Sequence, residues 1–375
     1  MTQETTADQP THLHWDSGTG YELFICLLVL HTPEKQGLRA SWAAGIRSRI
    51  PAVERKLLEE VVPFLTVPTN WIYHLQGPKD ALSVLWALRQ IPAVERIRTV
   101  FEIEQWSKSE VSRLSRIAEK HTWDEEDYQV LIPGLCKDDK PGQNPDALKK
   151  FLDWWAQPEK FGELYLLALQ AFYQVFFVED EKRIAPVLQS GLEHAQALSK
   201  TMTVQELLVE LSQGVRMTDF GDGDEVILVP AYWITPLLLH AEIEKDGRTT
   251  YIFMFGVRPD SMSIIPGEVV PDGLLRALKA LADSTRLKIM NYLSGEELSP
   301  SELARRLHLR APTVTHHLNE LRLAGLVNLT IHGQEKHYAA RREALPAMLK
   351  NLESFLDNAG EPASHELDDP EIIGK

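Results

Sequence analysis

The sequence predicts a mainly α-helical chain. It has a large N-terminal helical domain carrying a small antiparallel β hairpin or sheet at about residues 225–257, then a C-terminal domain of short helices with a second hairpin. Three observations support this fold class. Apolar residues recur at helical spacing between residues 21 and 214. The Asp246-Gly247 step separates two strand-like runs, which is a strong hairpin signal. Two short helices joined by a tight turn occupy residues 299–324.

Length and charge limit the possible organisation. A chain of 375 residues with 44% hydrophobic and 25% charged residues is typical of a globular protein with two or three domains. The net charge is -15, but residues 271–345 hold eleven Lys/Arg and eight Asp/Glu, a local balance of +3 that leaves -18 elsewhere. The C-terminal part is therefore locally basic on an acidic chain. This balance is compatible with contact to DNA but does not establish it.

Cysteine usage and hydropathy predict a cytoplasmic protein without a membrane span. Cys26 lies in an apolar run, and Cys136 stands beside Lys137, so a redox role for Cys136 is the alternative to a structural one. Two cysteines far apart do not indicate a disulfide framework. The apolar run of residues 23–30 is far shorter than the ~20 residues that cross a bilayer.

We expect five segments: a disordered leader (1–15), a helical domain with the small sheet (16–265), a second domain with the two short helices and the second hairpin (272–345), a further helix (346–358) and an acidic disordered tail (359–375). His12 and His14 in the leader have no third ligand nearby, so we expect them to be solvated rather than to bind metal. The last two helices of the first helical domain are expected at residues 161–177 and 184–212.

Two features of the N-terminal part allow two interpretations each. The hexapeptide IPAVER occurs at residues 50–55 and 91–96, either as a repeat of helical pairs or, as we favour, as a proline that opens a helix twice. A set of aromatic residues is either a ligand pocket or, as we favour, the core of the domain. Its members are Trp42, Trp71, Tyr73, Trp86, Trp106, Trp154, Trp155, Phe172, Tyr173, Phe176 and Phe177.

The C-terminal domain has local signals for each of its elements. Ser299 to Glu302 form a capping box with a proline at the first helical position, and residues 308–310 form the turn. Pro312 opens a second helix with apolar residues at Val314, Leu318 and Leu321, and a glycine ends it. These elements form a helix-turn-helix.

The flanking segments extend this motif. Asp283 is expected to cap the helix that follows it, which runs to about Leu293, and residues 342–357 form a final amphipathic helix. A hairpin with Gly333 at its tip follows the helix-turn-helix directly, so the predicted domain is a winged helix-turn-helix.

The second helix is the candidate to enter a DNA major groove. With the apolar residues facing inward, its outward residues could contact bases or phosphates, and the hairpin could contact phosphates. The predicted DNA-binding residues are Arg310, Ala311, Thr313, Thr315, His316, Asn319, Arg322, His332, Lys336 and His337. His316 and His317 are adjacent on a helix and point about 100° apart, so they do not chelate a metal together.

The segment ALADSTRLKIMNYL, the SELARRL helix, PTVTHHLNELRLAGLV and the glycine-tipped hairpin closely resemble the ArsR (arsenical-repressor-like) winged-helix family over about residues 272–345. The resemblance implies a transcriptional regulator, commonly a repressor, that binds an inverted-repeat operator as a homodimer. It makes Leu274, Leu278, Leu349 and Phe355 candidates for the dimer interface.

Two departures from the family pattern change what is expected. The Cys-x-Cys pair of metal-sensing members is missing from the ELARRL helix, and residues 342–357 hold no histidine, so we expect no metal and no cofactor. Arg310 and Ala311 occupy the positions where members usually carry Ser and Gln, so we expect a different operator sequence.

These observations predict a DNA-binding regulator with double-stranded DNA and a second copy as partners, and with a possible small-molecule effector or partner sensed by the N-terminal domain. The alternatives are a protein-interaction adaptor and an enzyme with an accessory winged helix. No nucleophile elbow, phosphate-binding glycine loop or His-Glu-x-x-His motif supports an enzyme.

Overall fold

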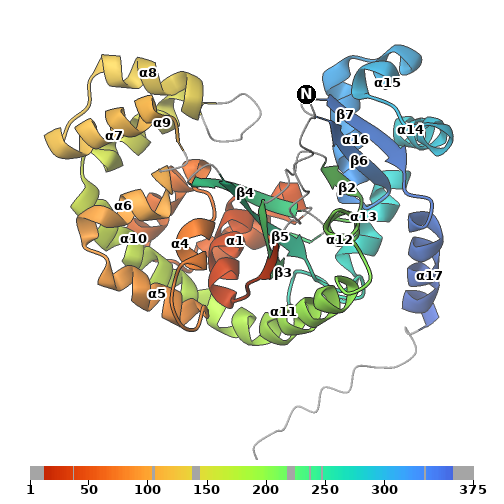
Figure 1. The fold of residues 1–375 in the computed structure, drawn as a ribbon, viewed down its shortest axis with the longest axis horizontal. Coiled ribbons are helices and arrows are strands. Elements are labelled where there is room, and N and C mark those ends of the chain that lie inside the picture. Colours follow the sequence, from red (N-terminus) through yellow and green to blue (C-terminus); the bar gives the residue numbers. More distant parts are fainter. Residues whose placement is uncertain are drawn as a thin grey trace, which may run out of the picture.

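The computed structural model describes residues 12–36, 38–103, 106–136, 144–217, 224–235, 238–245, 248–332 and 335–357. Helices dominate, and they enclose a four-stranded sheet in the N-terminal part, residues 12–265, which we call the body (Figure 1). The winged helix lies beside the body, at the blue end of the chain.

The helices of the body form an arc around α1 and the sheet (Figure 1). They are α1 (Thr19–His31), η1 (Pro33–Gln36), α2 (Ala40–Arg47), α3 (Ala52–Val61), η2 (Val62–Phe64), α4 (Thr69–Tyr73), α5 (Ala81–Gln90), α6 (Ala93–Val100), α7 (Lys108–Lys120), α8 (Glu125–Leu135), α9 (Pro145–Trp155), α10 (Pro158–Phe172), η4 (Tyr173–Phe177), α11 (Val178–Leu198) and α12 (Val204–Leu211).

Helix α10 is central to this arc because it packs against α3, α5, α6 and α9. Phe161, Tyr165 and Phe172 on it are fully buried. Helix α10 continues through the π-helical η4 into α11, and the stretch Pro158–Leu198 is long and apolar enough to cross a membrane by length and composition alone. Half of its most apolar window is buried within the protein, as in the core helix of a globular domain.

Most of the aromatic set belongs to the core, as expected. Trp155, Phe172, Tyr173 and Phe177 are buried, and all the others except Trp86 pack against the same cluster. Trp86 is 66% exposed. The two IPAVER copies make the same local structure, because Pro51 and Pro92 precede α3 and α6 as their N-cap residues.

The expected helix of residues 184–212 is wrong in its extent. Helix α11 ends at Leu198, and Thr203 begins α12 with a capping box that it forms with Glu206. Thr203 and Glu206 have the spacing of a capping box, which was therefore readable in the sequence.

The sheet of the body is larger than predicted and mixed. Its order is β1 (His12–Trp15), β3 (Glu225–Ala231), β5 (Arg248–Gly256), β4 (Leu238–Lys245). The β4–β5 pair is antiparallel, which confirms the hairpin, whose turn residues lie outside the described residues. The purely antiparallel prediction is wrong because β3 pairs parallel with both β1 and β5. Strand β3 is buried on both faces, which is typical of a central parallel strand.

The prediction of a disordered leader is also wrong for residues 12–15. They form the edge strand β1, and its His12 and His14 side chains are exposed. Residues 1–11 and the acidic tail of residues 359–375 lie outside the described residues.

The winged helix-turn-helix has the predicted elements. They are α13 (Asp272–Leu281), α14 (Ser284–Gly295), α15 (Pro300–Leu307), α16 (Ala311–Leu323), β6 (Val327–His332), β7 (Glu335–Ala340) and α17 (Ala344–Asp357). Asp283 caps α14 by accepting the backbone N–H groups of Thr285 and Arg286, each at 2.9 Å. A separate apolar core of α14, α15, α16 and the hairpin holds the domain together.

The body contributes a strand to the wing, which the sequence did not indicate. Strand β2 (Val215–Met217) pairs parallel with β6, so the wing sheet has the order β2-β6-β7. The backbone N–H of Leu329 also donates to the carbonyl of Gly214 at 2.9 Å. The two parts of the chain are therefore joined by backbone hydrogen bonds as well as by the linker.

Candidate nucleic-acid interface

A cap and two turns with positive φ angles determine where α15 and α16 begin and end. The capping box of Ser299 and Glu302 is complete at the start of α15. His308 ends that helix in the left-handed conformation with φ 54°, which turns the chain toward α16. Gly325, with φ 68°, reverses the chain after α16 and leads into the wing.

One face of α16 is buried in the core of the winged helix. Val314, Leu318 and Leu321 each have 0% exposure. The opposite face carries the side chains that the sequence placed toward a groove, and all of them are exposed: Ala311, Thr313, Thr315, His316 and Asn319. The structure therefore brings these five residues together on one open helix face.

The Thr315 hydroxyl is committed within the helix. It donates to the carbonyl oxygen of Ala311 at 3.0 Å, which is a common local bond for threonine in helices. Because the hydroxyl is already bonded within the helix, the methyl group is the part of Thr315 that remains for contact with a thymine methyl.

The two arginines of the set differ in exposure. Arg310 is the N-cap residue of α16, makes no side-chain cap and is exposed. Arg322 is half-buried, and burial lowers the pKa of its guanidinium, an effect that nearby Tyr338 opposes. Arg310 is the better placed of the two for a phosphate or guanine contact.

The wing places its basic residues near the end of the hairpin. Lys336 is exposed, and His332 is the last residue of β6. His337 is half-buried, with Nε2 3.7 Å from a Glu335 carboxylate oxygen, so this acid lies beside the imidazole that the sequence placed toward phosphates. Residues 333–334 at the tip lie outside the described residues.

The candidate dimer residues lie on α13 and α17, which pack against each other. Leu278 is 38% exposed and Leu349 is 53% exposed, whereas Leu274 is 4% exposed because it packs between the two helices. Phe355 is half-buried against the same small cluster. Three further leucines on these helices are exposed but were not among the predicted interface residues: Leu275, Leu345 and Leu356.

No group of three or more His, Cys, Asp or Glu side chains that could hold a metal ion occurs among the described residues. Cys136 is half-buried, and burial raises the pKa of its thiol. The reactive thiolate is therefore disfavoured at this position.

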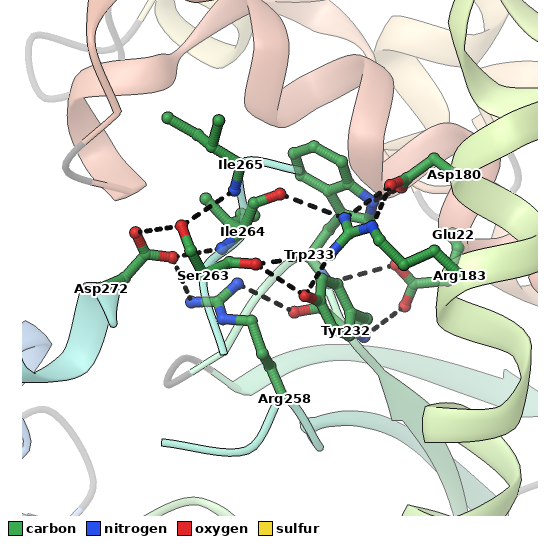
Figure 2. Close-up of polar contacts among 10 residues, drawn as sticks. All are labelled: Glu22, Asp180, Arg183, Tyr232, Trp233, Arg258, Ser263, Ile264, Ile265 and Asp272. Atoms are coloured by element: carbon green, nitrogen blue, oxygen red, sulfur yellow. Dashed lines mark hydrogen bonds and ion pairs between the residues drawn. The ribbon is translucent and has the colours of Figure 1, made fainter. Parts of the chain in front are cut away.

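A buried polar network extends from the core of the body toward the winged helix (Figure 2). Glu22 has 0% exposure, and its carboxylate accepts the backbone N–H groups of Tyr232 at 2.7 Å and Trp233 at 3.2 Å. Burial raises the pKa of Glu22 to about 8, although both hydrogen bonds act in the opposite direction. Arg183 joins Asp180 to the Tyr232 hydroxyl.

The network ends on the first residue of α13. Arg258, which is 7% exposed, donates to the Tyr232 carbonyl at 3.3 Å and lies 3.6 Å from the carboxylate of Asp272 (Figure 2). Asp272 also accepts the Ser263 hydroxyl at 3.0 Å and the backbone N–H of Ile264. These bonds attach the start of the winged helix to the body.

Arg276, one turn further along α13, contacts the recognition helix. Its Nη1 donates to the carbonyl of Leu323, the last residue of α16, at 3.1 Å. Burial lowers the pKa of its guanidinium to about 10. No sequence pattern indicated this role, because a single arginine on an amphipathic helix normally faces solvent.

The fold and this helix face define a winged helix-turn-helix regulator. Residues 283–328 match the family described as bacterial regulatory protein, arsR family. The chain is 28% identical over 79 residues to the transcriptional repressor SdpR of Bacillus subtilis (strain 168), covering 21% of this chain and 88% of the relative. It is 39% identical over 75 residues to the transcriptional activator HlyU of Vibrio cholerae, covering 20% and 69%.

Among solved structures, an ArsR-like transcriptional regulator from Rhodococcus sp. RHA1 is 32% identical, with a TM-score of 0.22, over 23% of this chain and 79% of the other. The chain belongs to the ArsR family of transcriptional regulators, through a shared region that is about a fifth of its length.

Proposed function

We propose that this protein is a cytoplasmic transcriptional repressor that binds an inverted-repeat operator as a homodimer, without a resident metal, and that the body conveys a signal to the winged helix. The observation that carries the proposal is the outward face of α16, where five small or polar side chains are exposed on a helix whose other face is buried. Arg310, the N-cap residue of α16, and Lys336, on the wing strand β7, are exposed and add positive charge.

DNA binding is tested by gel shift on the DNA upstream of the protein's own gene, in a series of salt concentrations. Binding should weaken as salt rises, because phosphate contacts release counterions. Absence of salt-dependent binding there, and in a selection from random sequences, would refute the proposal. Transcription of a reporter from the selected site, with and without the protein, separates repression from activation; increased transcription would refute repression.

The homodimer is supported by exposed apolar residues on α13 and α17. Five leucines on these two helices are between 38% and 61% exposed: Leu275, Leu278, Leu345, Leu349 and Leu356. Burying such a surface against a second copy is favourable. Replacing Leu349 by Glu should shift the protein to monomer in analytical ultracentrifugation while its circular dichroism stays unchanged. A variant with an unaltered oligomeric state would contradict this interface.

A protein-interaction adaptor has one observation in its favour. Leu82 and Trp86 lie one turn apart on α5 and are 57% and 66% exposed, which forms an apolar patch on the body. This patch lies on the body and not on the winged helix. It is therefore compatible with a protein partner that binds the body, in addition to DNA binding by α16.

A further inference from the structure

We propose that a proton on the buried carboxyl group of Glu22 keeps the junction between the body and the winged helix closed, and that loss of this proton opens the junction and weakens operator binding. The inference rests on the proposed function and names a proton as one signal that the body conveys to the winged helix. The side chains that connect Glu22 to the start of the winged helix are drawn in Figure 2.

The Glu22 carboxylate is buried on neutral partners. It has 0% exposure, and it accepts the backbone N–H groups of Tyr232 at 2.7 Å and Trp233 at 3.2 Å. An ionised carboxylate is costly in such surroundings, because two neutral donors replace its hydration only in part. Burial accordingly raises the pKa of Glu22 to about 8.

The titratable and charged groups around Glu22 are Cys26 on α1, Asp180 and Arg183 on α11, Tyr232 after β3 and Arg258 after β5. Burial raises the pKa of the Cys26 thiol and of the Tyr232 hydroxyl, so both stay protonated near neutral pH. Burial also raises the pKa of Asp180, and its ion pair with Arg183 opposes this rise. The charge of Asp180 further raises the pKa of Glu22, whereas Arg258 lowers it. Glu22 is therefore the group whose charge we expect to change between about pH 7 and 9.

One peptide group joins Glu22 to Arg258. Its N–H, that of Trp233, donates to Glu22, and its carbonyl oxygen, that of Tyr232, accepts Arg258 Nη1 at 3.3 Å (Figure 2). Water can replace this N–H at the carboxylate only if the peptide group moves. That movement also breaks the Arg258 bond, so hydration of Glu22 and release of Arg258 are one event.

The same residues hold the start of α13. Arg258 Nη2 lies 3.6 Å from Asp272 Oδ2, and Asp272 also accepts the Ser263 hydroxyl at 3.0 Å and the backbone N–H of Ile264. The Tyr232 hydroxyl donates to the Ser263 carbonyl at 2.9 Å. Displacement of Tyr232 therefore weakens both the ion pair of Asp272 and the segment that bonds to it.

The proton then determines how often the junction opens. In the closed junction the pKa of Glu22 is about 8, whereas a hydrated carboxyl group has the ordinary value of 4.5. Because the closed form binds the proton more tightly, rising pH favours the open form. With these two values, the ratio of open to closed molecules rises about tenfold between about pH 7 and 9.

Opening is measured on the full chain without DNA by hydrogen exchange. The amides of Trp233 and Ile264 should both exchange about tenfold faster at pH 9 than at pH 7, after correction for the intrinsic effect of pH on exchange. The Leu303 amide, which donates to the Ser299 carbonyl at 3.1 Å inside the winged helix, should show no such change. Unchanged exchange at Trp233 would overturn the role of Glu22. Faster exchange at Trp233 without Ile264 would overturn the link to the winged helix.

A matched pair of variants identifies the titrating group. Glu22→Gln carries no charge at any pH, so the dependence of exchange on pH at Trp233 and Ile264 should disappear. Glu163 on α10 is exposed, and Glu163→Gln should keep the dependence of the unaltered protein. A Glu22→Gln variant that keeps this dependence would overturn the proposal.

Asp272→Asn tests the link even if Glu22→Gln does not fold. It removes the charged partner of Arg258 and leaves Glu22 in place. Exchange at Trp233 should still depend on pH, whereas operator affinity should no longer do so. A variant whose operator affinity keeps its full dependence on pH would overturn the role of the ion pair.

Operator affinity is measured with a labelled duplex from the random-site selection between about pH 7 and 9, where an ordinary histidine is largely neutral. The Kd of the unaltered protein should rise about threefold to tenfold, and that of Glu22→Gln should stay constant. An unchanged Kd, or an equal rise in both proteins, would overturn the regulatory part of the inference. If no duplex binds at any pH, while Trp233 and Ile264 exchange as expected, the proton-controlled junction stands and the proposed function fails.

Discussion

Gly214 is the residue through which the body strand β2 meets the wing, and replacing it by alanine should loosen this connection. Its φ is +103°, a conformation that alanine adopts at a cost of about 1–2 kcal/mol. An added Cβ would lie 2.0 Å from Asn328 Oδ1, 2.8 Å from its Cγ and 3.2 Å from its Cα. The amide group can rotate away, but the backbone Cα of β6 can move only by displacing the strand.

The chain offers a matched control in Gly77. Its φ is +93°, and a Cβ added there would meet nothing within 4 Å. Because the two φ angles are similar, Gly77→Ala should have a backbone strain comparable to that of Gly214→Ala, without the steric conflict. We expect Gly77→Ala to cost about 1 kcal/mol, because alanine also restricts the unfolded chain. Gly214→Ala adds about 1–3 kcal/mol for overpacking against Asn328.

The measurement is urea unfolding followed by circular dichroism, together with operator affinity for each variant. Gly214→Ala should unfold at lower urea than Gly77→Ala, and it alone should bind DNA more weakly because the wing moves with β6. If the free energies of unfolding of the two variants agree within about 0.5 kcal/mol, β2 does not hold the wing in solution, and the reasoning is refuted.

Three further predictions follow from the site and the core. Replacing Thr315 and His316 together by alanine should weaken specific binding by about 1–3 kcal/mol with little change in thermal midpoint, since both residues are exposed; equal losses of both would count against a base-contacting role. The folded-state pKa of Glu22, about 8 against an ordinary 4.5, means that the folded protein holds a proton that the unfolded chain releases, so stability should fall as pH rises between these values. In urea titrations at several pH values, Glu22→Gln should remove up to about 5 kcal/mol of the fall in the free energy of unfolding between these pH values. A variant whose free energy of unfolding keeps the same dependence on pH would contradict a protonated Glu22. Stoichiometric zinc, cadmium or arsenite should leave the operator complex intact in gel shift. Release of DNA by any of them would reveal a metal site other than the Cys-x-Cys pair and the last-helix ligands of the family.

The winged helix was predictable because its signals are local. The Ser299 capping box, the Asp283 cap and Gly325 each act within four residues of their own position. The outward face of α16 follows from helical periodicity alone, and the structure places Thr313, Thr315 and their neighbours where the period requires.

The connections between distant segments were not predictable in this way. Strands β1 and β2 have four and three residues, and their partners β3 and β6 lie more than ~100 residues away in the chain, so no local pattern indicates them. The parallel pairing of β3 had a readable signal, because its run of apolar residues lacks the alternation of a half-exposed antiparallel strand.

Arg258 and Arg276, the two arginines that fix α13 in place, show the same limit. Each is an ordinary charged residue in the sequence, yet Arg258 is buried and Arg276 is half-buried in the structure. Asp272 becomes a neighbour of Arg258 only where the body packs against the winged helix, and Leu323 becomes a neighbour of Arg276 only where α13 packs against α16.

The acidic charge outside the winged helix has a consequence for the proposed search for an operator. The part of the chain outside residues 271–345 carries a charge of -18. The backbone pairing of β2 with β6 holds part of this negative charge close to the winged helix. Any duplex that meets α16 also meets this repulsion, whether or not its bases match. Weak attachment to the many non-operator sites of a genome leaves more of the protein free to search. A small number of copies per cell can then keep one operator occupied.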